Sequence, residues 1–257
     1  MKILISCMAC QAATGIPCGH RELASVTEPG IYETTCPTNS EKTFLILQGE
    51  KFEVFFEKSL LALHNEAYSE AVILSVTAIE LFLNFSTKVM TATKETTFED
   101  LESIDKSINT AERNIGAYLL ASELWATQNT SHLPIDLKFI DKVRKTRNKC
   151  AHDGYLPLPE KAQKHVESLA KACLESICIL REKASEAFDQ VFSQHNLRLA
   201  RDARERQKQL GIESTNPATV CPPFRVGLLN AEAVFDIVKE VEIAYENQLL
   251  FTRIASN

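Results

Sequence analysis

The feature that most constrains the fold is a change in the spacing of apolar residues near residue 48. After that point apolar side chains recur at intervals of three and four, as in Phe52, Phe55 and Phe56, which is the spacing of one helix face. Before it, β-branched and aromatic residues run together at 31–35 and 43–47 around a Pro, Asn and Ser cluster, which is typical of a hairpin. The chain therefore combines a small β piece with a longer helical body.

The helical body predicts a mainly α protein, an all-α bundle with four or five core helices. Only 8 Gly and 9 Pro occur in 257 residues, which disfavours a β-rich fold with many tight turns. A Pro-containing connector precedes an extra C-terminal helix. The predicted helices begin at about 48 and then cover 66–90, 101–126, 135–150, 160–209 and 230–250. The predicted division is 1–47, 48–210 and 211–257.

Two further expectations follow from charge and hydropathy. The net charge of −6 argues against a protein coated with basic charge. No apolar run approaches the length that a bilayer requires, and the apolar start Ile3-Leu4-Ile5 is short for a signal sequence. We therefore expect a cytoplasmic protein with no membrane partner.

Four of the eight cysteines lie in the first 36 residues, which in a cytosolic chain favours metal binding over disulfides. Cys7-x-x-Cys10 resembles one zinc knuckle, since two thiolates at this spacing bind one tetrahedral ion. Cys36 before a proline is similar to the start of the second knuckle of a zinc ribbon. That knuckle lacks its partner, so the fourth ligand would be Cys18 or His20. We expect a structural zinc; the alternative is a degenerate ribbon that holds no metal.

A pair of polar residues in the predicted helix 135–150 is the strongest functional signal. Arg147 and His152 are separated by four residues, with Asn148 between them. Arg147 follows the apolar spacing of this helix, so it is expected to face inward and to need an anionic partner. Five helical residues turn through about 500°, so Arg147 and His152 converge only if the helix ends between them. Gly154 suits such an end.

The same helix carries a local excess of positive charge. Residues 138–149 contain six basic side chains and one acidic one, a net charge of +5, which fits a phosphate-binding surface. The alternative is a cationic helix end that complements the macrodipole. The candidate RNA-binding residues are Lys142, Arg144, Lys145 and Lys149.

The Arg147-Asn148-x-x-x-His152 segment, followed by Asp153 and Gly154, resembles the HEPN domains (higher eukaryotes and prokaryotes nucleotide-binding). The resemblance covers roughly 48–195, and Glu80 is similar to the acidic residue that many members carry on the second helix. It implies a HEPN-like helical bundle behind a zinc-ribbon-like hairpin. Many HEPN proteins are metal-independent ribonucleases that act as toxins or abortive-infection effectors, and others are inactive binding modules.

The residue types suit RNA cleavage without a metal. Histidine is the usual proton acceptor in such chemistry, so His152 is suited to accept the proton of a 2′-hydroxyl. Arg147 holds phosphate oxygens in a bidentate fork. Asn148 is expected to orient the imidazole or a phosphate, and Asp153 to fix the imidazole tautomer or to form the turn.

Three functions remain open from the sequence. The first is a metal-independent HEPN ribonuclease in a toxin–antitoxin or antiviral defence setting, with an antitoxin or defence-system partner. The second is a non-catalytic HEPN module that binds RNA, a nucleotide or a partner protein, and the third is a zinc-ribbon adaptor whose bundle only dimerises. For the first we expect a two-fold homodimer with a shared site, because one Arg/His pair lacks the acid for the leaving oxygen. The stripe of Leu180, Phe188, Val191 and Leu199 suggests dimerisation through the long helix.

Overall fold

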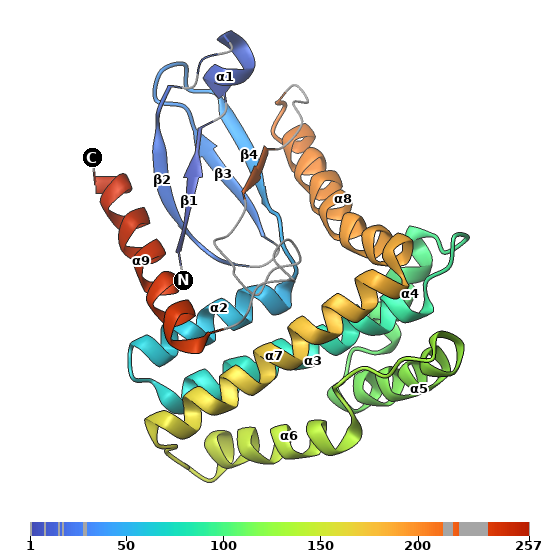
Figure 1. Ribbon diagram of the computed structural model, residues 1–257. Helices are drawn as coiled ribbons and strands as arrows, with labels where there is room; N and C mark the ends of the chain where they lie inside the picture. The colour runs from blue at the N-terminus through green and yellow to red at the C-terminus, as the bar shows by residue number, and fades with distance from the viewer. Residues whose placement is uncertain are drawn as a thin grey trace. The chain divides into compact units, whose positions relative to one another are not determined.

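The computed structural model (Figure 1) describes residues 2–7, 9–14, 16, 18–27, 30–212, 218–220 and 236–256. The chain forms two compact units. Unit 1 comprises Met1–Gly49, Ser193–Pro223 and Tyr245–Asn257, and unit 2 comprises Glu50–Phe192 and Phe224–Ala244. The predicted three-part division stays a prediction, because compactness does not show which parts fold independently.

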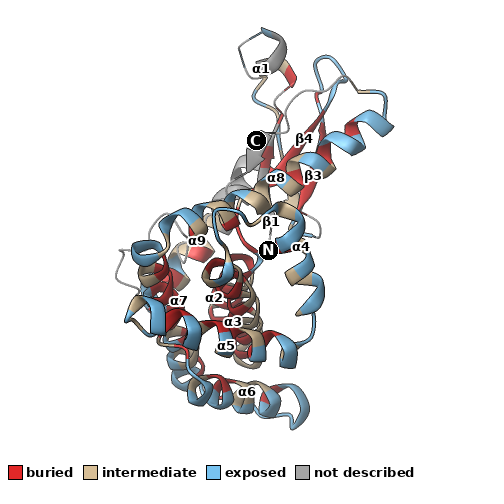
Figure 2. Ribbon diagram, turned by 90° about the vertical axis from the view of Figure 1, so that its right-hand side faces the viewer, coloured by how far each residue is buried: buried red, intermediate tan, exposed pale blue. Residues whose placement is uncertain are grey.

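Unit 2 is a bundle arranged around one central helix. Helix α3 packs against α2, α5, α6 and α7, and Figure 2 shows buried residues concentrated along α2 and α3. The rings of Phe52, Phe82, Phe85 and Phe188 form a chain of aromatic contacts with centroids 5.2 to 6.3 Å apart. The helices are α2 (Lys51–His64), α3 (Tyr68–Thr91), α4 (Phe98–Ser107), α5 (Ala111–Asn129), α6 (Leu137–His152), α7 (Pro159–Lys183), the first part of α8 (Ser185–Gln209) and the first part of α9 (Ile237–Ser256).

The most apolar of these helices is a core element. Among the described residues, α3 is the one helix long and apolar enough to cross a membrane. However, 61 % of its most apolar window is buried inside the protein. Its apolar composition therefore accords with its place at the centre of the bundle.

Two predicted helices are each divided in two. The segment predicted as 101–126 is α4 and α5, because the chain breaks at Ile108 and Thr110 starts a new helix by accepting a hydrogen bond from the backbone N–H of Arg113. The segment predicted as 160–209 is α7 and α8, interrupted at Ala184, whose φ of −141° is not helical. Each segment was predicted as one helix, and both predictions were wrong. Neither break contains Gly or Pro, the residues that most often mark the end of a helix in a sequence.

The stripe that suggested dimerisation through the long helix is buried within the chain. Leu180, Phe188 and Val191 belong to the core of unit 2. Leu199 packs in unit 1 against a core that includes Ile31. These side chains therefore form no exposed seam, and the suggested contact is wrong.

Unit 1 is built on two small sheets. Strand β1 (Lys2–Ser6) pairs antiparallel with β2 (Arg21–Ser25), and β3 (Ile31–Thr35) pairs antiparallel with β4 (Lys42–Leu47) in the register Ile31↔Ile46. The β3–β4 pair confirms the predicted hairpin. The β1–β2 pair was not predicted, nor was the short helix α1 (Ala9–Thr14) or strand β5 (Ala218–Val220), which pairs parallel with β4.

The predicted connector falls largely outside the described residues. This applies to Pro217, Pro222 and Pro223, and to the first residues of the predicted helix 230–250. The described part of the last helix is α9. The fold is thus mainly α with a small β portion, as predicted.

Candidate functional sites

Helix α6 carries the Arg/His motif and is fixed at both ends. Asp136 caps its start by accepting a hydrogen bond from the backbone N–H of Phe139, and Gly154 follows its end with φ +65°. The helix includes His152, so it does not end between Arg147 and His152 as convergence within one chain requires. At about 100° per residue these two side chains leave α6 some 140° apart.

One face of α6 is an exposed row of lysines that ends at the histidine. Lys138, Lys142, Lys145, Lys149 and His152 are all exposed and follow one another at intervals of four, three, four and three residues. They lie within about 80° of one another around the helix. We call these five residues the lysine row. Lys138 was not among the predicted RNA-binding residues, although the helical period applied to the sequence already places it here.

The opposite side of α6 presents two arginines to acidic residues of neighbouring helices. Arg144 and Arg147 are partly buried. Arg144 Nη2 lies 3.1 Å from Oε1 of Glu112 on α5. Burial raises the pKa of the Glu80 carboxyl on α3, and the charges of Arg147 and Arg144 oppose that rise. Arg144 therefore belongs to this ion-pair cluster and not to the lysine row.

The remaining motif residues divide between these two sides. Arg147 Nη1 donates to Oδ1 of Asn148 at 3.1 Å. Asp153 is exposed beside His152, and its backbone N–H donates to the carbonyl of Lys149 at 3.1 Å. The structure thus brings Glu80 and Asn148 to Arg147, and leaves His152 with Asp153 at the exposed end of the helix.

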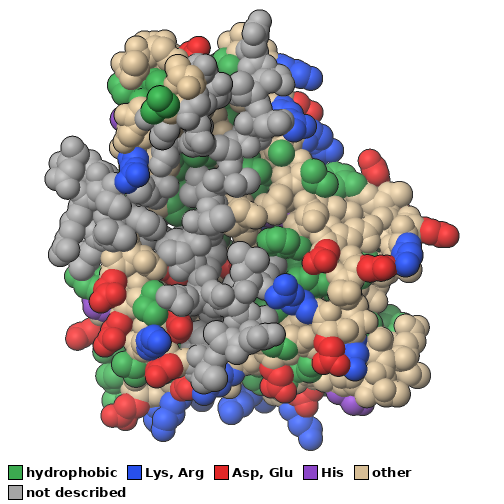
Figure 3. All heavy atoms as spheres, turned by 45° about the horizontal axis from the view of Figure 1, so that its top comes forward, with side chains coloured by type: hydrophobic (Ala, Val, Ile, Leu, Met, Phe, Trp, Pro, Cys, Tyr) green, Lys and Arg blue, Asp and Glu red, His purple; other side chains and the backbone are tan. Residues whose placement is uncertain are grey.

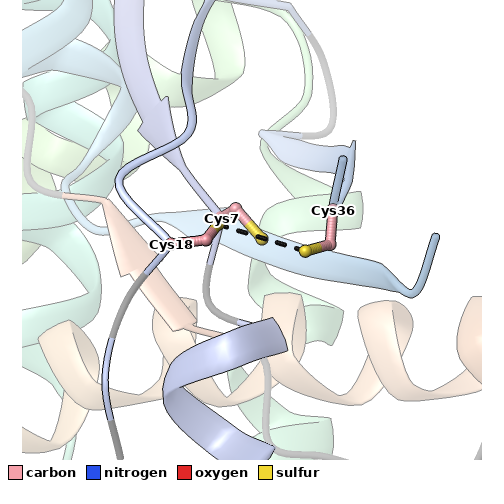
Figure 4. A group of neighbouring side chains, drawn as sticks. All are labelled: Cys7, Cys18 and Cys36. Atoms are coloured by element: carbon pink, nitrogen blue, oxygen red, sulfur yellow. Dashed lines mark hydrogen bonds between the residues drawn. The ribbon is translucent and has the colours of Figure 1, made fainter. Parts of the chain in front are cut away.

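The second candidate site is a cluster of four cysteines in unit 1. The sulfur atoms of Cys7, Cys18 and Cys36 all lie within 4.8 Å of one another, and Figure 4 shows these three side chains pointing toward one another. Cys10 Sγ lies 3.4 Å from Cys36 Sγ, and Cys36 Sγ lies 4.0 Å from Cys18 Sγ. Cys7 follows β1, and Cys36 follows β3, so the two sheets present their ends to one point.

Two of the cysteines have the same local backbone arrangement. The sulfur of Cys7 accepts hydrogen bonds from the backbone N–H groups of Ala9 and Cys10. The sulfur of Cys36 accepts them from Thr38 and Asn39. In both cases the donors lie two and three residues after the cysteine, so the chain turns around each sulfur in a knuckle.

These contacts set the protonation of the cluster. Burial alone would raise the pKa of Cys36, but the backbone donors and the thiols of Cys10 and Cys7 outweigh it and lower that pKa to about 6. Burial raises the pKa of Cys7 to about 11, and the thiol contact with Cys36 raises that of Cys10 to about 11. Cys36 is therefore the cysteine that accepts hydrogen bonds from the thiols of Cys10 and Cys7, as expected where several coupled thiols share one negative charge.

The geometry of the cluster suits a tetrahedral zinc ion. A Zn–S bond of about 2.3 Å implies sulfur atoms roughly 3.8 Å apart, and the distances of 3.4 and 4.0 Å bracket that value. All four cysteines are free rather than disulfide-bonded. Cys7, Cys10, Cys18 and Cys36 thus have the geometry to hold a structural zinc. The backbone carbonyl of His20 accepts a hydrogen bond from the N–H of Cys7 at 2.9 Å. Its side chain is not part of the metal-binding group that the described residues form.

Charged side chains of both signs are intermingled on the face drawn in Figure 3. No family model, no curated protein and no solved structure matches this chain.

Proposed function

We propose that this protein is a metal-independent ribonuclease of the HEPN type that cleaves RNA at a dimeric Arg/His site. The observation that carries the proposal is the lysine row, which places His152 at the end of an exposed cationic track. Acting with it is Arg147, which is held near Glu80 of α3. The HEPN resemblance of the motif gives the same assignment.

The spacing of the lysine row suits the phosphates of a single strand. Residues three or four apart rise about 4.5 to 6 Å along a helix, which is comparable to the phosphate spacing of an extended RNA. Lys142, Lys145 and Lys149 would each contact one phosphate. His152 would then meet the next nucleotide.

The cleavage step needs no metal. The imidazole of His152 accepts the proton of a 2′-hydroxyl, and the 2′-oxygen attacks the adjacent phosphorus. The bond from phosphorus to the 5′-oxygen breaks, and that oxygen takes a proton from an acid. The products are a 2′,3′-cyclic phosphate and a 5′-hydroxyl, and Arg147 stabilises the charge that develops on the phosphate oxygens.

A second copy of the chain would complete this site. Arg147 and His152 point about 140° apart within one helix, so one chain does not present both to one phosphate. A two-fold axis beside α6 would bring His152 of one protomer toward Arg147 of the partner subunit. It would also supply a second imidazole as the acid for the leaving oxygen.

The test is cleavage of single-stranded RNA by folded variants. His152→Ala should lower the rate about 100-fold or more, because general acid–base catalysis typically contributes 10² to 10⁴. Arg147→Lys should fail as well, because an ammonium does not reproduce the bidentate fork. His132→Ala, which changes another exposed histidine, is the control, and all rates should be unchanged in chelator. Undiminished cleavage by folded His152→Ala would contradict the proposal.

A binding function without cleavage is the second candidate, and the lysine row favours it equally. In that case RNA affinity survives His152→Ala and falls when lysines of the row are neutralised. Under either function we propose a cytoplasmic setting in toxin–antitoxin or antiviral defence, with a cognate antitoxin or defence-system partner.

The cysteine cluster has a separate role in the proposal. A zinc ion held by Cys7, Cys10, Cys18 and Cys36 would join β1, β2 and β3 of unit 1. Structural zinc supplies folding free energy to small domains with little core. It would take no part in cleavage.

A further inference from the structure

We infer that the ring of Tyr155 is a stacking platform for an unpaired RNA base at the end of the lysine row. The proposed site then takes single-stranded RNA and shows little preference among the four bases. This role rests on the proposed function, because it assumes that the lysine row binds RNA, and it adds the residue that contacts a base. A platform of this kind acts in binding, so it is present whether or not the RNA is then cleaved.

The loop that follows α6 presents apolar side chains to solvent. Tyr155 is 36 % exposed, Leu156 is 81 % exposed and Leu158 is 58 % exposed. All three follow His152 within six residues. A single exposed leucine is normal on a protein surface, but three neighbouring apolar residues beside a charged track are typical of a binding surface.

The backbone of this loop is fixed to two helices. The N–H of Tyr155 donates to the carbonyl of Lys149 on α6 at 3.1 Å, and the carbonyl of Tyr155 accepts from the hydroxyl of Ser69 on α3 at 3.0 Å. Gly154 makes the turn with φ +65°, and Pro157 is buried. Tyr155 is therefore positioned before a ligand arrives, which lowers the entropy cost of binding.

The position of Tyr155 suits a strand that lies along the lysine row. Its hydrogen bond to Lys149 joins the loop to a member of the row, and His152 lies between the two in the sequence. Aromatic rings beside a cationic track are the usual means of binding single strands without sequence preference, because every base has a flat face that stacks.

The stacked base has to be unpaired. Within a duplex the neighbouring bases cover both faces of each base, so only a base outside a duplex reaches a protein ring. An unpaired nucleotide also has the freedom to place its 2′-oxygen in line with the leaving 5′-oxygen, as the proposed cleavage requires. The lysine row beside the loop favours RNA over an apolar protein segment as the occupant.

The experiment measures the affinity of the full chain for a labelled 2′-O-methyl oligouridylate of about ten nucleotides. This probe has no free 2′-hydroxyl, so the proposed reaction leaves it intact. Tyr155→Ala should weaken binding about fivefold or more, whereas Tyr155→Phe should bind like the wild type. Tyr155→Leu should be as weak as Tyr155→Ala, because leucine is apolar but has no flat ring. Leu197→Ala, which changes an exposed leucine of α8, is the control.

Two further measurements separate stacking from charge. Tyr155→Ala should leave the slope of log affinity against log salt unchanged, because the lost contact is not ionic. With a probe of the same length that lacks its bases, Tyr155→Ala should have no effect, because the partner of the ring is then already absent.

A folded Tyr155→Ala protein that binds the oligouridylate like the wild type would overturn the platform. Full binding by Tyr155→Leu would overturn it as well, and would show a general apolar contact of the kind that a protein partner makes. Failure of the proposed cleavage gives a different result: the wild type leaves unmodified RNA intact, while Tyr155→Ala still weakens binding. RNA that is cleaved normally, with an affinity that Tyr155→Ala does not change, would overturn the platform alone.

Discussion

The two units of this protein obtain their stability from different sources. Unit 2 consists mainly of one continuous run of helices around a core in which Phe52, Phe82 and Phe85 are almost fully buried. Unit 1 combines three separate segments around a small apolar core that includes Ile31 and Phe44, together with the cysteine cluster. The first has a large apolar core, whereas the second has a small core and a cysteine cluster whose geometry suits a cross-linking zinc ion.

The difference extends to the candidate functions. The lysine row and its histidine lie on the surface of the well-packed unit, where buried residues such as Ile140 and Val143 fix the orientation of α6. The cysteines are themselves part of the packing of unit 1. A change to the motif should therefore alter chemistry without altering the fold, whereas a change to the cysteines should alter the fold.

Loss of a proposed zinc ligand is expected to have the largest effect, and it should be confined to unit 1. Cys36→Ser removes the sulfur that contacts both Cys10 and Cys18, and structural zinc contributes on the order of 10 kcal/mol to the folding of small domains. Hydrogen exchange should show residues 31–47 losing protection while residues 68–91 keep theirs. Cys178→Ser on α7 is the control. Elemental analysis well below one zinc per wild-type chain, in protein purified without chelator, would contradict the zinc assignment.

A change in the core of unit 2 should have the opposite result: it should destabilise unit 2 and leave unit 1 folded. Phe82→Ala should lower the free energy of unfolding by about 3 to 5 kcal/mol, because it leaves a cavity among buried aromatic rings. Phe55, which is only partly buried, should tolerate alanine with a smaller loss. Urea unfolding followed by helical circular dichroism measures both, and bound zinc should remain at the unfolding midpoint of Phe82→Ala if the units are stabilised separately.

Neutralising the lysine row should weaken RNA binding without changing stability. Replacing Lys145 and Lys149 by glutamine removes two phosphate contacts, so the slope of log affinity against log salt should become shallower by about 0.7 per lysine for a single strand. The same change at Lys161 and Lys164, two exposed lysines of α7, is the control. An equal effect of both pairs would show that net charge, and not the row, governs binding.

The smallest expected effect is a pH dependence of unit 2. Burial, together with the charge of Glu240, raises the pKa of Glu57 from 4.5 to about 8. The folded state therefore holds a proton that the unfolded chain releases, so the stabilisation is complete below pH 4.5 and is lost as the pH rises through 8. Between pH 7 and 9 the free energy of unfolding should fall by on the order of 1 kcal/mol. Glu57→Gln should remove this fall, and Glu175→Gln at an exposed site should not.

The helices were predictable where local spacing determines them. Helices α2, α3 and α6 lie within a few residues of the predicted ranges, because their apolar residues repeat with the helical period. The helix breaks before Thr110 and at Ala184 were not predicted, because neither contains the Gly or Pro that usually marks such a break in a sequence. Strands β1 and β5 were missed for a different reason, since each is stabilised by a partner distant in the sequence, as β5 is by β4.

The sites were predictable in residue type more than in arrangement. The spacing of Cys7 and Cys10 indicated a metal site, but only the fold brings Cys18 to the sulfur group in preference to His20. Spacing likewise indicated Arg147 and His152, but not that α6 continues through both and separates them. That separation follows from the helix boundary, which a local pattern places only to within a few residues.

The central claim is that residues from two chains form one cleaving site, and mixing the wild type with an inactive variant tests it most directly. The proposed site takes one imidazole from each chain, so a dimer of wild type with His152→Ala lacks either the base or the acid. Random exchange in an equal mixture leaves a quarter of the dimers fully wild type, so the mixture should keep about a quarter of the RNA cleavage shown by the same total amount of wild type. A mixture that exchanges subunits and keeps half of that cleavage, as independent sites in each chain would give, would contradict the shared site.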